Sequence, residues 1–209
     1  MDRCVPETPT PPVCATARRA PRAAAVRAAL ALALGLVAAA TFAGRAHARA
    51  SQPFAARAGL DLARSAAMAW AEDAVLIYVE NDEPLDARGA STRWGYLFFS
   101  ASHDESRAYS IENGKIVVAE TLALKFEAPP LGADWIDSGA ALTVAEEASR
   151  EFRGKAGGKL SNMVLVRGAF QDDDPDPPAW TFIYSAPHAP SLFVVVDAAA
   201  GKVKRTWRG

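Results

Sequence analysis

The sequence predicts an α+β fold built from two similar units in tandem. The same order of features occurs over residues 60–122 and again over residues 142–207: a helix, an apolar strand, a Trp-led aromatic strand, and a Gly-Lys turn before a β-branched strand. The interval from the leading Trp to the turn Gly is 20 residues in the first copy and 21 in the second. Such matched spacing indicates duplication of one small unit. Each unit is expected to place one helix across the concave face of a curved antiparallel sheet of three to four strands.

The leading strands carry aromatic residues at alternate positions. Their sequences are WGYLFFS over residues 94–100 and WTFIYS over residues 180–185. The aromatic residues in question are Trp94, Tyr96, Phe98, Trp180, Phe182 and Tyr184. Alternate residues of a strand share one face, so each trio is interpreted as core beneath its helix, with a ligand platform as the alternative. Phe99 and Ile183 point to the opposite face, where the two copies or a partner are expected to pack.

The first unit begins with an alanine-rich helix over residues 55–70. Leu62, Ala66 and Trp70 are spaced by four, which predicts the buried face. Residues 74–80 (AVLIYVE) are too short for another core helix and rich in Val, Ile and Tyr, so they are predicted to form a buried strand.

The rest of the first unit is predicted to be a meander of strands. Residues 81–92 have loop composition, and strands are expected over residues 94–102, 107–111 and 116–126. The clearest turn signal is Asn113-Gly114, since this pair can occupy both positive-φ positions of a type I′ turn.

The second unit begins after a break at residues 129–132 (PPLG). Either Asp137 or Ser138 can cap its helix, and a capping box from Thr143 to Glu146 competes one turn later. The predicted apolar face comprises Leu142, Ala145, Ala148 and Phe152, and glycines at 154, 157 and 158 end the helix. Strands are expected over residues 159–166, 180–185, 192–197 and 202–207, with an acidic, Pro-rich loop over residues 171–178.

The first 50 residues have the composition of a secretory signal peptide. Four arginines between positions 18 and 27 precede an apolar run over residues 28–43, and Ala46-His47-Ala48 offers a small-residue cleavage site. This run is shorter than the roughly 20 residues that span a bilayer. Cleavage is therefore expected near Ala48 or Ala50, with retention as an anchor as the alternative.

Cleavage changes the charge and the cysteine content. Residues 1–48 contain six of the 23 basic residues and two of the 24 acidic residues, which leaves 17 against 22. A chain that is about five charges negative is a poor partner for nucleic acid or an anionic membrane surface. Both cysteines, Cys4 and Cys14, would leave with the signal, so packing without disulfides must stabilise the exported protein.

The second copy resembles PepSY-like domains. The resemblance rests on Glu146-Glu147-Ala148 in an N-capped helix, a strand, an aromatic strand, and then Val194-Val195-Val196-Asp197-Ala198 followed by Gly201-Lys202-Val203. It covers residues 135–206 and extends more loosely to residues 60–122. The resemblance implies a cystatin-like fold in each unit and an exported or membrane-tethered protein. Regulatory or inhibitory roles toward peptidases are proposed for some members. The implied organisation is a signal peptide (1–48), a divergent first unit (55–127), a linker (128–136) and a second unit (137–209).

Two histidines in predicted turns suggest a hydrolase as a minor reading. His103 lies near Ser100, Ser102, Asp104 and Ser106, and His188 lies near Ser185 and Ser191. A catalytic triad takes its members from separate parts of a fold, and residues adjacent in one turn rarely provide that geometry. Solvated turns are the preferred interpretation.

Two acidic clusters are also interpreted as structural features and not as binding sites. Asp172, Asp173, Asp174 and Asp176 could bind calcium, but the stretch lacks the glycine and distal glutamate of a helix-loop-helix calcium loop. It is interpreted as a charged loop, and calcium binding stays open. Glu146 and Glu147 lie about 100° apart on a helix and are interpreted as a solvated face.

These observations favour a non-catalytic protein, periplasmic or secreted, that binds a protein or peptide partner through a sheet edge or a helix-free face. Regulation or inhibition of a peptidase is the role that the resemblance implies. The alternative is a small-ligand carrier with a pocket between helix and sheet, lined by the strands of Trp94 and Trp180. The sequence assigns no catalytic, cofactor-binding or metal-ligating residue and leaves the oligomeric state open.

Overall fold

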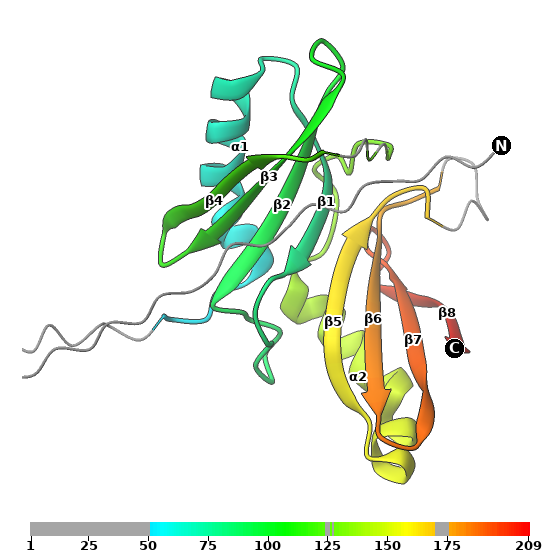
Figure 1. Ribbon diagram of the computed structural model, residues 1–209. Helices are drawn as coiled ribbons and strands as arrows, with labels where there is room; N and C mark the ends of the chain where they lie inside the picture. The colour runs from blue at the N-terminus through cyan, green and yellow to red at the C-terminus, as the bar shows by residue number, and fades with distance from the viewer. Residues whose placement is uncertain (1–50, 124–125, 127, 170–175) are drawn as a thin grey trace, which may run out of the picture. The chain divides into compact units, whose positions relative to one another are not determined.

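The strands of both halves join one antiparallel sheet in the computed structural model, which describes residues 51–123, 126, 128–169 and 176–209 (Figure 1). The order across this eight-stranded sheet is β4-β3-β2-β1-β5-β6-β7-β8. The first half contains η1 (Ala56–Gly59), α1 (Leu60–Trp70), β1 (Val75–Asn81), β2 (Arg93–Ser100), β3 (Glu105–Glu112) and β4 (Lys115–Thr121). The second half contains α2 (Ser138–Ala156), β5 (Lys159–Val166), β6 (Ala179–Ala186), β7 (Ala189–Asp197) and β8 (Lys202–Arg208). The α+β class and the antiparallel pairing agree with the prediction. The signal segment expected over residues 1–48 lies outside the described residues.

The two halves meet where β1 pairs with β5, so one sheet is found where the sequence analysis expected two. Tyr78, Val79 and Glu80 pair in antiparallel register with Val166, Leu165 and Val164. Two separate sheets would leave the backbone groups of β1 and β5 unpaired along strands rich in apolar residues, and pairing the strands removes those edges.

The side chain of Asn81 extends this joint. Its Oδ1 accepts a hydrogen bond from the buried backbone N–H of Met163 at 2.7 Å, and its Nδ2 donates to the carbonyl of Glu83 at 3.0 Å. Asn81 is 9% exposed, so both bonds form where water is largely excluded. The amide therefore replaces one rung of the ladder between β1 and β5.

Both helices cover the same face of the sheet. Helix α1 packs on β2, β3 and β4, and α2 packs on β6, β7 and β8, behind the strands as drawn in Figure 1. The aromatic trios of β2 and β6 face the helices and belong to one continuous core cluster. Trp94 and Trp180 contact each other edge to face with ring centroids 6.3 Å apart. The core thus runs across the joint beneath both helices.

Each leading Trp also anchors the segment that precedes the helix of its own half. The indole N–H of Trp94 donates to the carbonyl of Phe54 at 2.7 Å, and that of Trp180 donates to the carbonyl of Ile136 at 2.8 Å. Burying an indole N–H without an acceptor costs free energy, and for Trp94 and Trp180 the chain entering the helix supplies the acceptor.

The segments that lead into the two helices are also bonded to each other. The backbone N–H groups of Ala56 and Arg57 donate to Ser138 Oγ and Asp137 Oδ1, both at 3.1 Å. The guanidinium of Arg57 lies 3.9 Å from the centroid of the Trp135 ring and donates to the carbonyl of the same residue. Through these contacts the N-terminal ends of both helices are held together.

The predicted buried face of the first helix is wrong. Leu60, Ala63 and Ala67 are buried, whereas Leu62 is 37% exposed. Of the other residues in the predicted stripe, Ala66 is half-buried and packs against the core, and Trp70 is half-buried at the edge of the helix. Small alanines allow the helix to approach the sheet closely, so a face of lower hydrophobicity packs inward.

The second helix follows its prediction more closely. Asp137 is the N-cap, its side chain accepting the N–H of Ser138 at 2.7 Å, and Gly157 ends the helix with φ of 66°. Leu142, Ala145 and Phe152 are buried as expected, but Ala148 is exposed, and Ser149 takes its place on the buried face.

The predicted turns are confirmed. Asn113 and Gly114 both have positive φ, at 50° and 69°, between β3 and β4. The carboxylate of Asp197 accepts the N–H groups of Ala199 and Ala200 at 2.8 Å, and Gly201 adopts φ of 65° before β8.

We predict that Asn81→Ala lowers the free energy of unfolding by about 1–3 kcal/mol in a urea titration, because the buried N–H of Met163 loses its acceptor. Asn162→Ala is the control, since the Oδ1 atom of Asn162 is buried without a hydrogen-bond partner in the described structure. A loss for Asn81→Ala no larger than that of the control would contradict the role given to this amide.

Candidate functional site

The turn that contains His103 is organised by a carboxylate that the sequence analysis did not single out. Asp73 accepts hydrogen bonds from Ser100 Oγ at 2.7 Å, from Ser102 Oγ at 2.9 Å and from the Ser102 N–H at 2.7 Å. The bond from Ser100 and then those from Ser102 lower the pKa of Asp73 to about 2. The ring of His103 packs instead against the ring of Trp70, with centroids 5.2 Å apart. The serines thus bond directly to the carboxylate, an arrangement that fixes a turn.

The second histidine lies in the exposed turn between β6 and β7. Ser185, near His188, shares a hydrogen bond of 3.2 Å with Ser161 on the neighbouring strand. In both turns, therefore, serines near the histidine bond to other partners: Ser100 and Ser102 to Asp73, and Ser185 to Ser161.

The acidic loop is described only at its end. Asp172, Asp173 and Asp174 lie outside the described residues, so the interpretation of this stretch as a charged loop stays a prediction and calcium binding stays open. Asp176 forms a largely buried ion pair with Lys204 at 2.7 Å and accepts the N–H of Gly168 at 3.0 Å. Its carboxylate is thus already bonded within the chain.

The aromatic trios are packed core. Trp94, Trp180, Phe182 and Tyr184 have no exposed surface, and Tyr96 and Phe98 are 1% exposed. The hydroxyl of Tyr96 donates to the carbonyl of Ala56 at 2.6 Å. These side chains fill the space between helix and sheet where a carrier pocket was considered.

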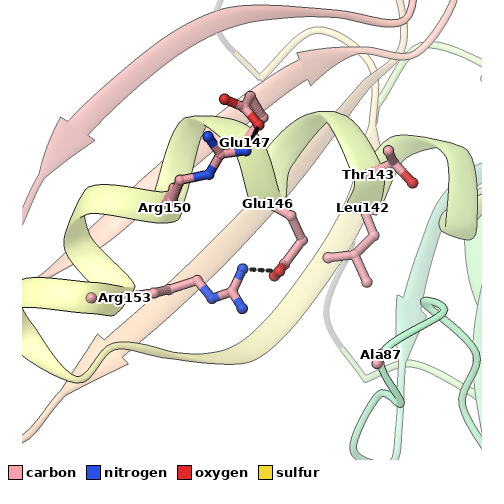
Figure 2. Close-up of a pocket in the computed structure, with 8 residues that line it drawn as sticks. Ala87, Leu142, Thr143, Glu146, Glu147, Arg150 and Arg153 are labelled. Carbon is pink, nitrogen blue, oxygen red and sulfur yellow. Dashed lines mark hydrogen bonds and ion pairs between the residues drawn. The ribbon is translucent and has the colours of Figure 1, made fainter.

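A wide groove of about 630 Å³ lies along α2, with Ala87 on its far side (Figure 2). Figure 2 shows Arg153 directed toward Glu146 and Arg150 toward Glu147, and both acids form ion pairs with these arginines. The groove is thus lined by charges that neutralise each other. A charged ligand would have to displace a guanidinium from a carboxylate before it could bind, so the groove is interpreted as a solvated helix surface.

A second groove, on the face opposite the helices, combines apolar walls with carboxylates. It has a volume of about 340 Å³. Its lining residues are Tyr78, Glu80 and Asp82, then Gly95, Tyr96 and Leu97 of β2, Ala108 and Ser110 of β3, and Leu122 and Phe126 beyond β4. We call this cavity the outer groove.

The carboxylates of the outer groove come from alternate positions of one chain segment. Tyr78, Glu80 and Asp82 project on the same side of β1 and its extension. The Tyr78 hydroxyl donates to Glu80 at 3.0 Å. Burial, and then the charge of Asp82, raise the pKa of Glu80. Arg93 forms ion pairs with Asp82 at 3.8 Å and with Glu83 at 2.5 Å. Within the described structure Glu80 has no cationic partner.

Gly95 keeps the floor of the outer groove open. A Cβ atom at this position would lie 2.7 Å from Asp82 Oδ1 and 3.4 Å from Glu80 Cγ. A side chain there would therefore displace the carboxylates. This site is not among the sequence-based predictions, because residues 74–80 are predicted only as a buried strand. The alternation of Tyr78, Glu80 and Asp82 was a usable signal for it.

The two edges of the sheet differ in chemistry. On β4, Ile116 and Val117 are 37% and 47% exposed, and Lys115 and Glu120 stand toward the ends of the strand. The other edge, β8, contains four cations, Lys202, Lys204, Arg205 and Arg208. Its Trp207 stacks on Phe193 with ring centroids 4.8 Å apart. Charges and packed side chains protect an edge strand from pairing, so β4 is the more open edge.

Comparison with known proteins leaves the family open. The sequence matches no family model and no curated protein. A solved structure, the Bacillus megaterium YpeB C-terminal domain, is similar over 75% of this chain with 12% sequence identity and a TM-score of 0.27. The chain spans 66% of that domain's length.

The described part of the chain lacks a membrane-spanning helix and a cluster of metal ligands. No helix there is long and apolar enough to span a membrane. The same residues include no group of three or more His, Cys, Asp and Glu side chains placed to hold a metal ion.

We predict that Asp73→Asn destabilises the protein at neutral pH and that this difference disappears in acid. The folded pKa of Asp73, about 2, is lower than its ordinary value of 3.8, so its stabilising effect is complete above about pH 4 and is lost as pH falls toward 2. Urea titrations of both proteins between pH 2 and pH 7 measure this. A difference in stability that is constant across that range would contradict the assignment.

Proposed function

We propose that this protein is a non-catalytic, exported PepSY-like protein that binds an extended segment of a protein partner along β4. The open edge of the sheet at β4 is the observation that carries the proposal. A strand at a sheet edge presents backbone N–H and C=O groups in a row, and an extended peptide can pair with them as an added strand. Side chains of the added strand would then contact Ile116 and Val117, which are exposed and apolar.

The export route belongs to the same proposal. Residues 1–48 would act as a signal peptide cleaved near Ala48 or Ala50, releasing the chain to the periplasm or the exterior. Within the described residues, the helices and strands run from Ala56 to Arg208, downstream of both proposed cleavage sites. The exported protein would then comprise the first unit (55–127), the linker (128–136) and the second unit (137–209).

The division into two cystatin-like units is supported by the order of elements. Each half has one α-helix followed by four antiparallel strands, and each leading Trp bonds to the chain just before its helix. Under this proposal only the first half binds the partner, because its edge strand β4 is apolar whereas the edge strand β8 of the second half is basic.

Regulation or inhibition of a peptidase is the role that best suits such an edge. A strand that pairs with a peptide segment can occupy the place of a substrate or hold a partner's loop. The contacts within the described turns offer no competing catalytic reading, because Asp73 bonds directly to Ser100 and Ser102. The carrier alternative loses its main support, because the space beneath the helices is filled by the aromatic trios.

We predict that Val117→Lys abolishes recovery of the partner when the exported form is used as bait in a periplasmic extract. A lysine on an edge strand opposes pairing, and Val117 is exposed enough to be replaced without disturbing the core. Val203→Lys on β8 is the matched control, because Val203 is 41% exposed on the opposite edge. A partner recovered by the parent protein and Val203→Lys but not by Val117→Lys supports binding at β4, and a peptidase among the recovered proteins supports regulation.

Equal recovery of the same proteins by both lysine variants would refute binding along β4. Recovery of no protein by the parent chain would favour the carrier reading over the partner-binding one.

A further inference from the structure

The outer groove has the features of a site for a positively charged side chain. Its walls are apolar, formed by Leu97, Ala108, Leu122 and Phe126, and Glu80 and Asp82 also line it. At about 340 Å³ it is at the small end of ligand pockets, which run from about 300 to 1,000 Å³. That size suits one or two side chains better than a cofactor.

The charges of the groove are incompletely balanced. Arg93 is shared between Asp82 and Glu83, at 3.8 Å and 2.5 Å. Glu80 receives a hydrogen bond from the neutral hydroxyl of Tyr78 but has no cation beside it among the described residues. A partly buried carboxylate without a counter-ion is costly, and a bound cation would relieve that cost. A basic ligand would therefore stabilise the carboxylate of Glu80 more than any other group in the groove.

The shape of the groove also favours a long side chain with an apolar stem. The ring of Phe126 meets that of Tyr78 edge to face with centroids 5.8 Å apart, and this pair contributes to one wall. Arg and Lys bury their methylene stems along apolar surfaces and keep the charged group at a polar end. Leu97 and Ala108 line the path of such a stem, and Glu80 and Asp82 can receive its charge.

The groove is continuous with the surface next to β4. In the register between β3 and β4, Ala108 lies opposite Glu120 and Ser110 opposite Val118. Adjacent strands are about 4.8 Å apart, so the groove residues of β3 lie one strand away from the open edge. A strand added at β4 would lie four strand spacings, roughly 19 Å, from Glu80 on β1. A basic side chain therefore reaches this carboxylate from a part of the partner segment that crosses the outer groove, with Glu120 as another carboxylate near its path.

We propose that the outer groove binds an arginine or lysine side chain of an extended, otherwise apolar peptide segment. This inference rests on the proposed function for the source of the peptide. It adds the chemistry by which the partner is selected: a basic residue in an extended stretch that lies over the outer groove. A protein that is about five charges negative after export would also attract a basic segment at long range.

Binding can be tested directly with short peptides. The probe is Thr-Val-Arg-Val-Thr with acetylated and amidated ends, and the comparison peptide has Gln in place of Arg. Added to the isotope-labelled exported form of the full chain, the Arg peptide should shift the backbone amide signals of Glu80, Gly95 and Ala108 saturably. The Gln peptide should bind at least about tenfold more weakly, since it lacks the charge-assisted contact.

Two variants test the groove itself. Glu80→Gln keeps an acceptor for the Tyr78 hydroxyl and removes only the charge, so it should weaken binding of the Arg peptide by about tenfold. Gly95→Ala places a methyl group against the carboxylate of Asp82 and should also weaken binding. Glu151→Gln is the control of equal charge change, since Glu151 pairs with Lys155 on α2, and it should leave affinity within about twofold.

Three results would overturn the inference: equal affinity for the Arg and Gln peptides, signal shifts confined to other residues, or equal losses in Glu80→Gln and Glu151→Gln. These results are separable from the test of the β4 edge. If Val117→Lys abolishes partner recovery while the Arg peptide fails to bind, the groove inference fails and the edge function stands. If the Arg peptide binds through Glu80 while Val117→Lys still recovers the partner, the groove stands and the edge function fails.

Discussion

The pairing of β1 with β5 is the constraint on which the rest of the molecule depends. Three residue pairs and the amide of Asn81 join the halves, and the edge-to-face contact of Trp94 with Trp180 continues the core beneath the joint. Because the central strands are paired with each other, the sheet has its two ends at β4 and β8. The joint therefore determines which strands are available to a partner.

Because both helices cover one face of the sheet, only the opposite face and the two edges are open to a partner. Both helices pack on the face that holds the aromatic trios, and hydrogen bonds between Ala56, Arg57, Asp137 and Ser138 tie their N-terminal ends together. Side chains on that face pack in the core or form hydrogen bonds with buried polar groups. The opposite face carries the outer groove, and there the carboxylate of Glu80 is left without a cation among the described residues. Core packing thus occupies one side of the sheet, and the proposed binding groove lies on the other.

The candidate site illustrates why sequence reasoning found the scaffold more readily than the surface. The loop over residues 81–92 is recognisable from its composition, but its contacts are not: Gly89 packs against the backbone of Ser138 and Gly139, where a Cβ atom would lie 2.9–3.0 Å away. That loop supports the start of α2. The outer groove combines Asp82 of this loop with side chains from β1, β2, β3 and the segment after β4. Their approach follows from strand register, which no local pattern encodes.

By itself the sequence determined the local structure of this protein: the duplicated order of elements, the Asn113-Gly114 turn, the Asp137 cap, the Gly157 stop and the burial of the Trp-led strands. These features depend on backbone conformations and alternation that neighbouring residues dictate. Tertiary structure decided which face of α1 is buried, that the halves share one sheet, and that Glu80 and Asp82 meet apolar walls. Those outcomes depend on packing between segments far apart in the chain, since burial is assigned only when the segments meet.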